Sequence, residues 1–279
     1  MPEIAYINNR FMPLEKAFVP INDRGYLFAD GIYEVIVTRS GKPFLIQEHL
    51  ERLQRSADAI LLQLPASSTE LTTMIEHGIK EAGFSETMVY IQITRGTEPR
   101  RHNYSSKIKA NLTMTFRAHP EYDPQIPLKG VAIMTVPEIR WSRCDIKSIA
   151  LLPNIMMKQK AVESGYQEAL FVTETGLVRE GTAANIFFIK DEVLHTPPAD
   201  QHILKGVTRS YILQQAKVHG IKQIERECTL AETLKADEVL ITSSTMDLIP
   251  VIKIDDTIIA NGQPGPFSKI IKDFFPKQT

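Results

Sequence analysis

A single lysine is the first of several residues in this sequence that could do chemistry. Lys147 stands between Ile146 and the apolar run 149–152. Such a lysine can be an ordinary one, whose stem covers apolar surface while its ammonium reaches water. Alternatively it is a desolvated amine, which acts as a nucleophile toward a carbonyl carbon. The sequence around Lys147 alone leaves both interpretations open.

Two charged residues elsewhere allow a similar choice. Glu180 comes just before Gly181 at the entry to an apolar strand, and it is either a turn residue or a carboxylate that accepts a hydrogen bond from a protonated pyridine nitrogen. Arg52 lies beside the apolar stripe of a predicted helix, one turn after Glu48. It either forms an i,i+4 ion pair worth a few tenths of a kcal/mol, or binds a phosphate through its guanidinium.

An anion site is indicated at the start of another predicted helix. Gly206, Val207 and Thr208 precede an amphipathic segment, and free backbone N–H groups at a helix N-terminus attract anions. Any helix start looks similar, so this signal is weak by itself. Hydroxyl groups follow a later strand, at Ser243, Ser244 and Thr245.

Composition and missing motifs exclude several other classes of protein. The 32 Lys and Arg residues balance 33 Asp and Glu residues, so no basic surface for nucleic acid or anionic lipid is expected. No apolar run could cross a bilayer, and the N-terminal residues do not have the pattern of a signal peptide. Cys144 and Cys228 are far apart, which favours a reduced, cytoplasmic protein. Phosphate-loop, dinucleotide and nucleophile-elbow motifs are missing, and the histidines lack metal-ligand spacing, so no metal is expected.

These residues must be positioned by two patterned regions of the chain. A polar stretch with three prolines, 119–130, separates them. We expect an α/β N-terminal domain over 1–120, a linker over 121–128 and a β-rich C-terminal domain over 129–279. Apolar spacing predicts helices over 46–62, 68–83, 154–165, 207–220 and 266–275. The second of these is expected to have Ser68 as its N-cap and Gly83 near its end.

Short apolar runs predict the strands of both domains, and "DRGYLFADG" (23–31) is expected to be a loop. The predicted strands cover 4–9, 15–21, 32–37, 88–96 and 110–118 in the first region, and 131–136, 168–173, 183–189, 192–196, 238–243 and 248–255 in the second.

The order of these features resembles the class IV aminotransferases, which are fold-type IV pyridoxal-phosphate enzymes. The matching blocks are "DRGYLFADGIYEV", "HLERLQRSA", "QITRGTEPRRH", "IRWSRCDIKS", "EGTAANIF", "ILKGVTR" and "VLITSST". This resemblance implies a two-domain fold whose C-terminal domain is a β-rich pseudo-barrel with helices that binds the cofactor. It also implies a Schiff base at Lys147 and a pyridine-nitrogen partner at Glu180. The phosphate ligands it implies are Arg52, Ser244 and the backbone amides of Val207 and Thr208.

Within this family the chain looks most like a D-amino-acid aminotransferase. The resemblance assigns Tyr33, Arg100 and His102 to the substrate's α-carboxylate. Two cations on a polar loop can also be plain surface residues, but an extended i,i+2 spacing points Arg100 and His102 to the same side and Arg101 to the other. Relatives often have serines where this chain has Thr182, Ala183 and Ala184, which could weaken cofactor binding or alter the substrate range.

The implied function is a ping-pong exchange of the amino group between a D-amino acid, such as D-alanine or D-glutamate, and a 2-oxo acid. Relatives are usually homodimers with sites near the subunit interface. Three alternatives are a branched-chain L-amino-acid transaminase, an (R)-amine transaminase and aminodeoxychorismate lyase. A fourth is a protein that binds the cofactor without catalysis.

Overall fold

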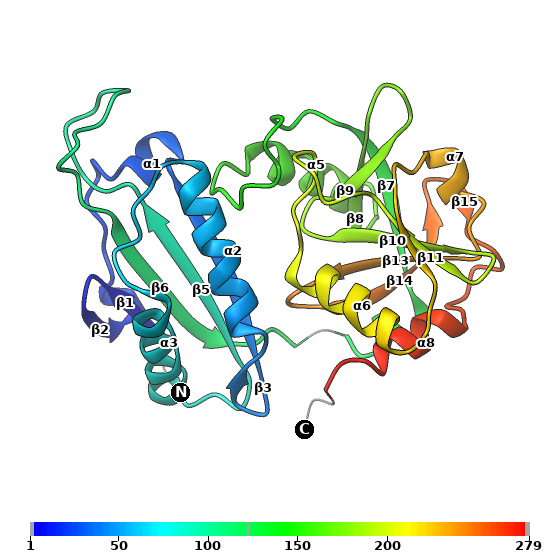
Figure 1. Cartoon of the computed structure of the whole chain (residues 1–279), viewed down its shortest axis with the longest axis horizontal. Helices are drawn as coiled ribbons and strands as arrows, with labels where there is room; N and C mark the ends of the chain where they lie inside the picture. Colours follow the sequence, from blue (N-terminus) through cyan, green and yellow to red (C-terminus); the bar gives the residue numbers. More distant parts are fainter. Residues whose placement is uncertain (1–2, 122, 277–279) are drawn as a thin grey trace. The chain divides into compact units, whose positions relative to one another are not determined.

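The computed structural model describes residues 3–121 and 123–276, which form two compact units (Figure 1). Of these described residues, unit 1 comprises 3–120 together with Ile146–Ala150, and unit 2 comprises the rest of 121–145 together with 151–276. The short segment that carries Lys147 therefore packs with unit 1, although its neighbours on both sides in the sequence belong to unit 2. The predicted linker over 121–128 contains the start of a short helix, α4 (Ile126–Lys129).

Unit 1 contains a six-stranded antiparallel sheet. Its strands, in spatial order, are β2 (Arg10–Pro13), β1 (Ile4–Ile7), β6 (Asn111–Ala118), β5 (Thr87–Thr94), β3 (Gly31–Arg39) and β4 (Lys42–Pro43). Side chains alternate between the two faces of a strand, so Val89, Ile91 and Ile93 of β5 are buried together on one face.

Two helices, α2 (Ile46–Ala59) and α3 (Ser68–Ala82), contribute the apolar side chains that complete this core. Figure 1 shows α2 lying across the sheet. The N-cap of α3 is Ser67, whose Oγ accepts the Glu70 N–H at 3.3 Å, so the expected cap at Ser68 was wrong by one residue. Gly83 ends α3 with φ +68°, the left-handed conformation that glycine adopts without strain.

Unit 2 is built on a nine-stranded mixed sheet. In spatial order it runs β12 (Gln223–Glu225), β11 (Val193–Thr196), β10 (Asn185–Lys190), β13 (Glu238–Ser243), β14 (Asp247–Ile254), β7 (Val131–Pro137), β8 (Glu168–Val172) and β9 (Val178–Gly181), with β15 (Thr257–Ile258) beside β14. The last strand, β9, also contacts β10, which curls the sheet into the expected pseudo-barrel. Apolar residues from most of these strands fill its interior.

Helices and turns complete unit 2. They are α5 (Leu152–Glu163), α6 (Val207–Val218), α7 (Leu230–Thr233) and α8 (Pro266–Lys272). Helices α5, α6 and α8 agree with the predicted segments to within three residues at each end. Strand β9 was not predicted, because its four residues, "VREG", include two charges that hide the strand pattern.

Two expectations near the N-terminus were wrong. No strand covers 15–21: after Pro13 the chain forms a 3₁₀ helix (Leu14–Lys16), and the apolar residues that follow are exposed rather than paired in a sheet. The expected loop at 23–31 contains a helix, α1 (Arg24–Phe28), which is capped by the side chain of Asp23. Five residues are too few for a helical period to be visible in sequence.

We predict that Gly78→Ala destabilises unit 1. A Cβ at this position of α3 would lie 2.2 Å from Cζ of the buried Phe116 ring. Alanine gains about 1 kcal/mol in helix propensity, but overpacking of the core costs up to about 3 kcal/mol, so unfolding in urea should show a net loss of about 1–2 kcal/mol. Glu76→Ala on the exposed face of α3 is the control. Equal stability of the two variants would contradict this packing.

Candidate active site

Lys147 is positioned by main-chain pairing with the first residues of β3. The Ile149 N–H donates to the Gly31 carbonyl at 3.1 Å, and the Tyr33 N–H donates to the Lys147 carbonyl at 3.0 Å. On its other side, the Lys147 N–H donates to Ser56 Oγ of α2 at 3.2 Å. The segment around Lys147 therefore pairs with β3 as an additional strand would, and its backbone has little freedom.

The lysine side chain lies over an aromatic ring. Lys147 Nζ is 4.2 Å from the centroid of Tyr33, within the range of a cation–π contact. Tyr33 in turn stacks on Tyr90 at 5.6 Å, and burial, with a smaller contribution from Tyr33, raises the pKa of Tyr90 to about 12. Lys147 itself is half-buried. The structure thus brings together two of the predicted site residues, Lys147 and Tyr33.

Arg52 of α2 is paired with a carboxylate of strand β3. Its Nε and a terminal nitrogen donate to the two carboxylate oxygens of Glu34 at 2.7 and 2.8 Å. His49 Nδ1 lies 2.7 Å from Glu34 Oε2. All three side chains are almost fully buried. Because strand side chains alternate, Glu34 faces α2 while Tyr33 faces the other side of the sheet.

The charges in this cluster are compensated. Burial alone would raise the pKa of Glu34, but the charge and hydrogen bonds of Arg52, followed by those of His49, hold it well below its ordinary value. Burial is also the largest cause of the lowered pKa of His49, although Glu34 opposes it. Glu34 therefore stays ionised at neutral pH and fixes the guanidinium of Arg52.

Arg100 and His102 form a separate group in unit 1. The Arg100 guanidinium lies 5.1 Å, and the His102 ring 5.7 Å, from the centroid of Phe28. Both therefore point to the same side, as their i,i+2 spacing predicts, whereas Arg101 pairs with Glu98 at 3.1 Å. Among the described residues, no hydrogen bond, ion pair or ring contact joins this group to the pair of Lys147 and Tyr33.

Glu180 is the centre of the corresponding cluster in unit 2. Its carboxylate, nearly fully buried at the end of β9, accepts hydrogen bonds from three directions. Arg140 donates to Oε1 at 2.6 Å, Asn185 Nδ2 donates to Oε2 at 2.9 Å, and the Leu204 N–H donates to both oxygens at 3.1 Å. A carboxylate held from three directions keeps one orientation.

Arg140 donates hydrogen bonds to two carboxylates. Besides Glu180, it donates to Glu138 at 2.6 Å, and its guanidinium lies 4.3 Å from the centroid of the Phe171 ring. Burial alone would lower the pKa of Arg140, but Glu138 and Glu180 raise it, so it remains charged. Two carboxylates share one guanidinium, and a negative charge is left over. Burial, with the charge of Glu138, raises the pKa of Glu180 although Arg140 and the Leu204 N–H oppose it, so a further cationic donor, such as a protonated pyridine nitrogen, fits this site.

The predicted anion site in unit 2 has a suitable geometry. Helix α6 begins at Val207, and its N-cap residue Gly206 provides no side-chain cap for the N–H groups of Val207 and Thr208. A Cβ on Gly206 would lie 2.0 Å from Asn185 Oδ1, so glycine lets the chain pass close to the side chain that holds Glu180. Ser244 is half-buried in the turn between β13 and β14.

The departure at Thr182 has a structural role in this chain. Its N–H donates to Glu168 Oε1 at 3.1 Å, and its hydroxyl bonds to the same oxygen. Asn154 Nδ2 donates to the Thr182 carbonyl at 2.8 Å. The hydroxyl that remains in this run therefore holds the turn after β9, and the following Ala183 and Ala184 contribute no hydroxyl group.

Sequence reasoning assigned no role to Glu34, His49, Glu138, Arg140 or Asn185. Glu34 carried a detectable signal, since a charge inside the apolar strand "IYEVIV" must find a partner. Arg140 was visible only as part of a matching block. Nothing local links Asn185 with Glu180, because the contact depends on β9 and β10 lying side by side.

Comparison with known proteins identifies the family. The family described as amino-transferase class IV matches residues 31–254. The chain belongs to the class IV aminotransferases. Aminotransferases of this class use pyridoxal phosphate, so the predicted enzyme class and cofactor are confirmed.

The relatives of this class IV aminotransferase agree with the predicted resemblance. It is 40% identical to the D-alanine aminotransferase of Bacillus licheniformis over 95% of this chain and 93% of that protein. It is 39% identical to the D-alanine aminotransferase of Listeria monocytogenes over 98% of this chain and 94% of that protein. The branched-chain amino acid aminotransferase of Escherichia coli has the same fold, with a TM-score of 0.91 at 23% identity, over 98% of this chain and 93% of that one. The fold-type IV prediction is thereby confirmed.

We predict that Glu34→Gln destabilises the protein by about 3 kcal/mol at pH 7, because the buried guanidinium of Arg52 then loses the negative charge of Glu34. The pKa of Glu34 is lowered in the folded state, so its contribution is present above the unfolded value of about 4.3 and is lost as the pH falls below it. Urea unfolding at pH 7 and pH 4 measures both effects. Glu48→Gln, on the exposed face of α2, should change stability by less than about 0.5 kcal/mol.

Glu180→Gln should change the pH dependence of stability in the opposite sense. The pKa of Glu180 is raised in the folded, cofactor-free protein. Its stabilising contribution is therefore present below the unfolded value of about 4.3 and is lost as the pH rises through the raised folded value. Melting temperatures of cofactor-free wild type and variant, compared from pH 4 to pH 8, should diverge in favour of glutamine as the pH rises. Parallel curves would contradict the assignment.

Proposed function

We propose that this class IV aminotransferase exchanges the amino group of a D-amino acid, such as D-alanine or D-glutamate, with a 2-oxo acid by a ping-pong mechanism. The observation that carries the proposal is the amine of Lys147, held over Tyr33 on a main-chain support. The D-alanine aminotransferases that are about 40% identical to the chain support the D configuration. The branched-chain enzyme at 23% identity bears on the fold alone.

Each unit, taken by itself, carries residues that suit a part of pyridoxal phosphate. In unit 2, the uncapped N-terminus of α6, at Val207 and Thr208, and the Ser244 hydroxyl are suited to the phosphate, and Glu180 is suited to the ring nitrogen. In unit 1, Arg52 supplies a fixed guanidinium and Lys147 the amine that binds the aldehyde. When bound, the cofactor withdraws electrons from the substrate's α-carbon.

Each residue then has a definite task. Glu180, oriented by its hydrogen bond from Arg140, would keep the proton on the ring nitrogen. Lys147 Nζ accepts the substrate's α-proton and later delivers it, which requires a neutral amine in the working state. The main-chain bonds on both sides of Lys147 fix the backbone from which its side chain reaches the Tyr33 ring.

The preference for D-amino acids depends on the carboxylate clamp. We assign Arg100, His102 and Tyr33 to the α-carboxylate, since a guanidinium binds a carboxylate through two parallel hydrogen bonds. Lys147 approaches from one side, and the clamp decides which hydrogen points at it. The location of Arg100 and His102, rather than that of the lysine, would therefore set the stereochemistry.

We also propose that the protein is a homodimer. Leu152, Ile155 and Met156 occupy one face of α5, and more than half of each side chain is exposed. Exposed apolar faces of this kind are typical of subunit interfaces. Arg100 and His102 are exposed as well, which suits a site near such an interface. The reduced, cytoplasmic setting stays a prediction; both cysteines are free thiols.

The decisive assay compares D-alanine with L-alanine as amino donor to 2-oxoglutarate. We expect turnover with D-alanine, parallel lines in double-reciprocal plots, and little turnover with L-alanine or L-leucine. Lys147→Ala should reduce the rate by about 10³-fold or more, because the amine that moves the proton is gone. Preferential use of L-leucine, use of (R)-1-phenylethylamine alone, or release of pyruvate from aminodeoxychorismate would replace the proposal by the corresponding alternative.

Arg100→Ala should raise KM for D-alanine by about 10- to 100-fold, because a charge-assisted contact to the carboxylate is lost. The absorption spectrum of the bound cofactor should stay the same. Arg101→Ala, which removes the neighbouring exposed cation, is the matched control and should leave KM within about twofold. An unchanged KM in the Arg100 variant would remove this residue from the clamp.

A further inference from the structure

The loop that carries Arg100 and His102 runs without regular secondary structure from the end of β5 at Thr94 to the start of β6 at Asn111. Loops of this length are uncommon in compact domains and are usually functional. Arg100 and His102 are exposed on this loop, so the loop needs a specific restraint to present them in one geometry.

A half-buried carboxylate holds two arginines at the base of this loop. Asp30, next to the start of β3, accepts hydrogen bonds from Arg24 Nε at 2.8 Å and from Arg95 Nε at 2.9 Å. The other nitrogens of Arg24 donate to the main-chain carbonyls of Arg101 and His102 at 2.7 and 3.0 Å. The backbone of the clamp segment itself, at Arg101 and His102, is thus bonded to a guanidinium that Asp30 orients.

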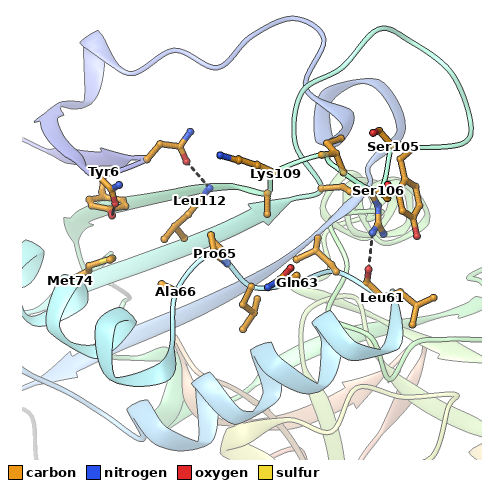
Figure 2. Close-up of a pocket in the computed structure, with 18 residues that line it drawn as sticks. Tyr6, Leu61, Gln63, Pro65, Ala66, Met74, Ser105, Ser106, Lys109 and Leu112 are labelled. Carbon is orange, nitrogen blue, oxygen red and sulfur yellow. Dashed lines mark hydrogen bonds between the residues drawn. The ribbon is translucent and has the colours of Figure 1, made fainter.

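Arg95 connects the same carboxylate to the end of α2. Its terminal nitrogens donate to the carbonyls of Ile60 at 2.8 Å and Leu61 at 3.1 Å, just after the last residue of that helix. A cation is favourable at a helix C-terminus. Figure 2 shows the bond to Leu61, with Ser105 and Ser106 of the loop close beside it.

Tyr104, on the loop itself, contacts both arginines. Its ring centroid lies 4.1 Å from the guanidinium carbon of Arg95 and 5.6 Å from that of Arg24, both within the range of cation–π contact. Phe28 lies between Arg24 and Arg100 in the same manner, at 4.9 and 5.1 Å. Aromatic faces therefore separate guanidinium groups that would otherwise repel each other.

We propose that Tyr104 is a positioning residue, which locks the loop onto the Arg24–Asp30–Arg95 group and so sets the geometry of the substrate clamp. The proposal rests on the proposed function of Arg100 and His102. Tyr104 does not touch substrate; it acts through the main chain of its own loop. Its ring is 41% exposed, so replacing it removes a restraint without opening the core.

Tyr104→Leu tests this in the holoenzyme, since leucine keeps apolar bulk but lacks a π face. We expect KM for D-alanine to rise about tenfold with kcat within about twofold, and hydrogen exchange of the amides in 98–107 to become several-fold faster. Tyr104→Phe should have the KM and the hydrogen-exchange rates of the wild type, because the ring is retained. The affinity for pyridoxal phosphate and the melting temperature should be unchanged throughout.

Asp30→Asn is the second variant, in which the two arginines lose their shared counter-charge. It should raise KM and loop exchange at least as much as Tyr104→Leu. The comparison with Arg100→Ala separates the possible failures. If Arg100→Ala raises KM while both Tyr104→Leu and Asp30→Asn leave KM and exchange unchanged, the positioning role is overturned and the clamp stands. If Arg100→Ala has no effect on KM, the clamp itself is wrong and the role of Tyr104 fails with it.

Discussion

The main-chain pairing of the Lys147 segment with the start of β3 is the constraint on which the proposed chemistry depends. Ile146–Ala150 packs with unit 1, although the chain on both sides of it belongs to unit 2. An amine that must receive a proton from one face of a carbon cannot sit on a freely moving segment. Hydrogen bonds from Tyr33, Ile149 and Lys147 itself give the segment the rigidity of a strand.

The buried charged groups of the two site clusters each have hydrogen-bonding partners. Arg52 is bound by Glu34 on two oxygens, and Glu180 is bound by Arg140, Asn185 and a main-chain N–H. A lone buried charge would cost several kcal/mol. The two clusters differ in balance: Glu34 is held ionised, whereas Glu180 shares its guanidinium with Glu138 and its pKa is raised. That imbalance is what makes Glu180 receptive to a cationic ring nitrogen.

Local patterns predicted the regular elements well and the partners of charged residues poorly. The apolar stripe of α2 and the alternation in β5 follow from periods of 3.6 and 2, which are visible in a short window. For Arg52 the sequence left two interpretations, an ion pair with Glu48 four residues away or a phosphate, and neither pointed to Glu34, which accepts its hydrogen bonds from a strand 18 residues earlier. Arg140 and Glu180 are 40 residues apart. Such pairs depend on which strands become neighbours, and local sequence does not encode that.

The same distinction explains why a fold can keep its chemistry while its substrate changes. Lys147 and Glu180 are fixed by strands, which the core holds in place, whereas Arg100 and His102 stand on a loop fixed by a few polar and aromatic contacts. Changing a strand contact would disturb the core and the reacting amine together. Changing the loop alters only where a carboxylate is held, so stereochemical preference can shift independently of the proton transfer that Lys147 performs.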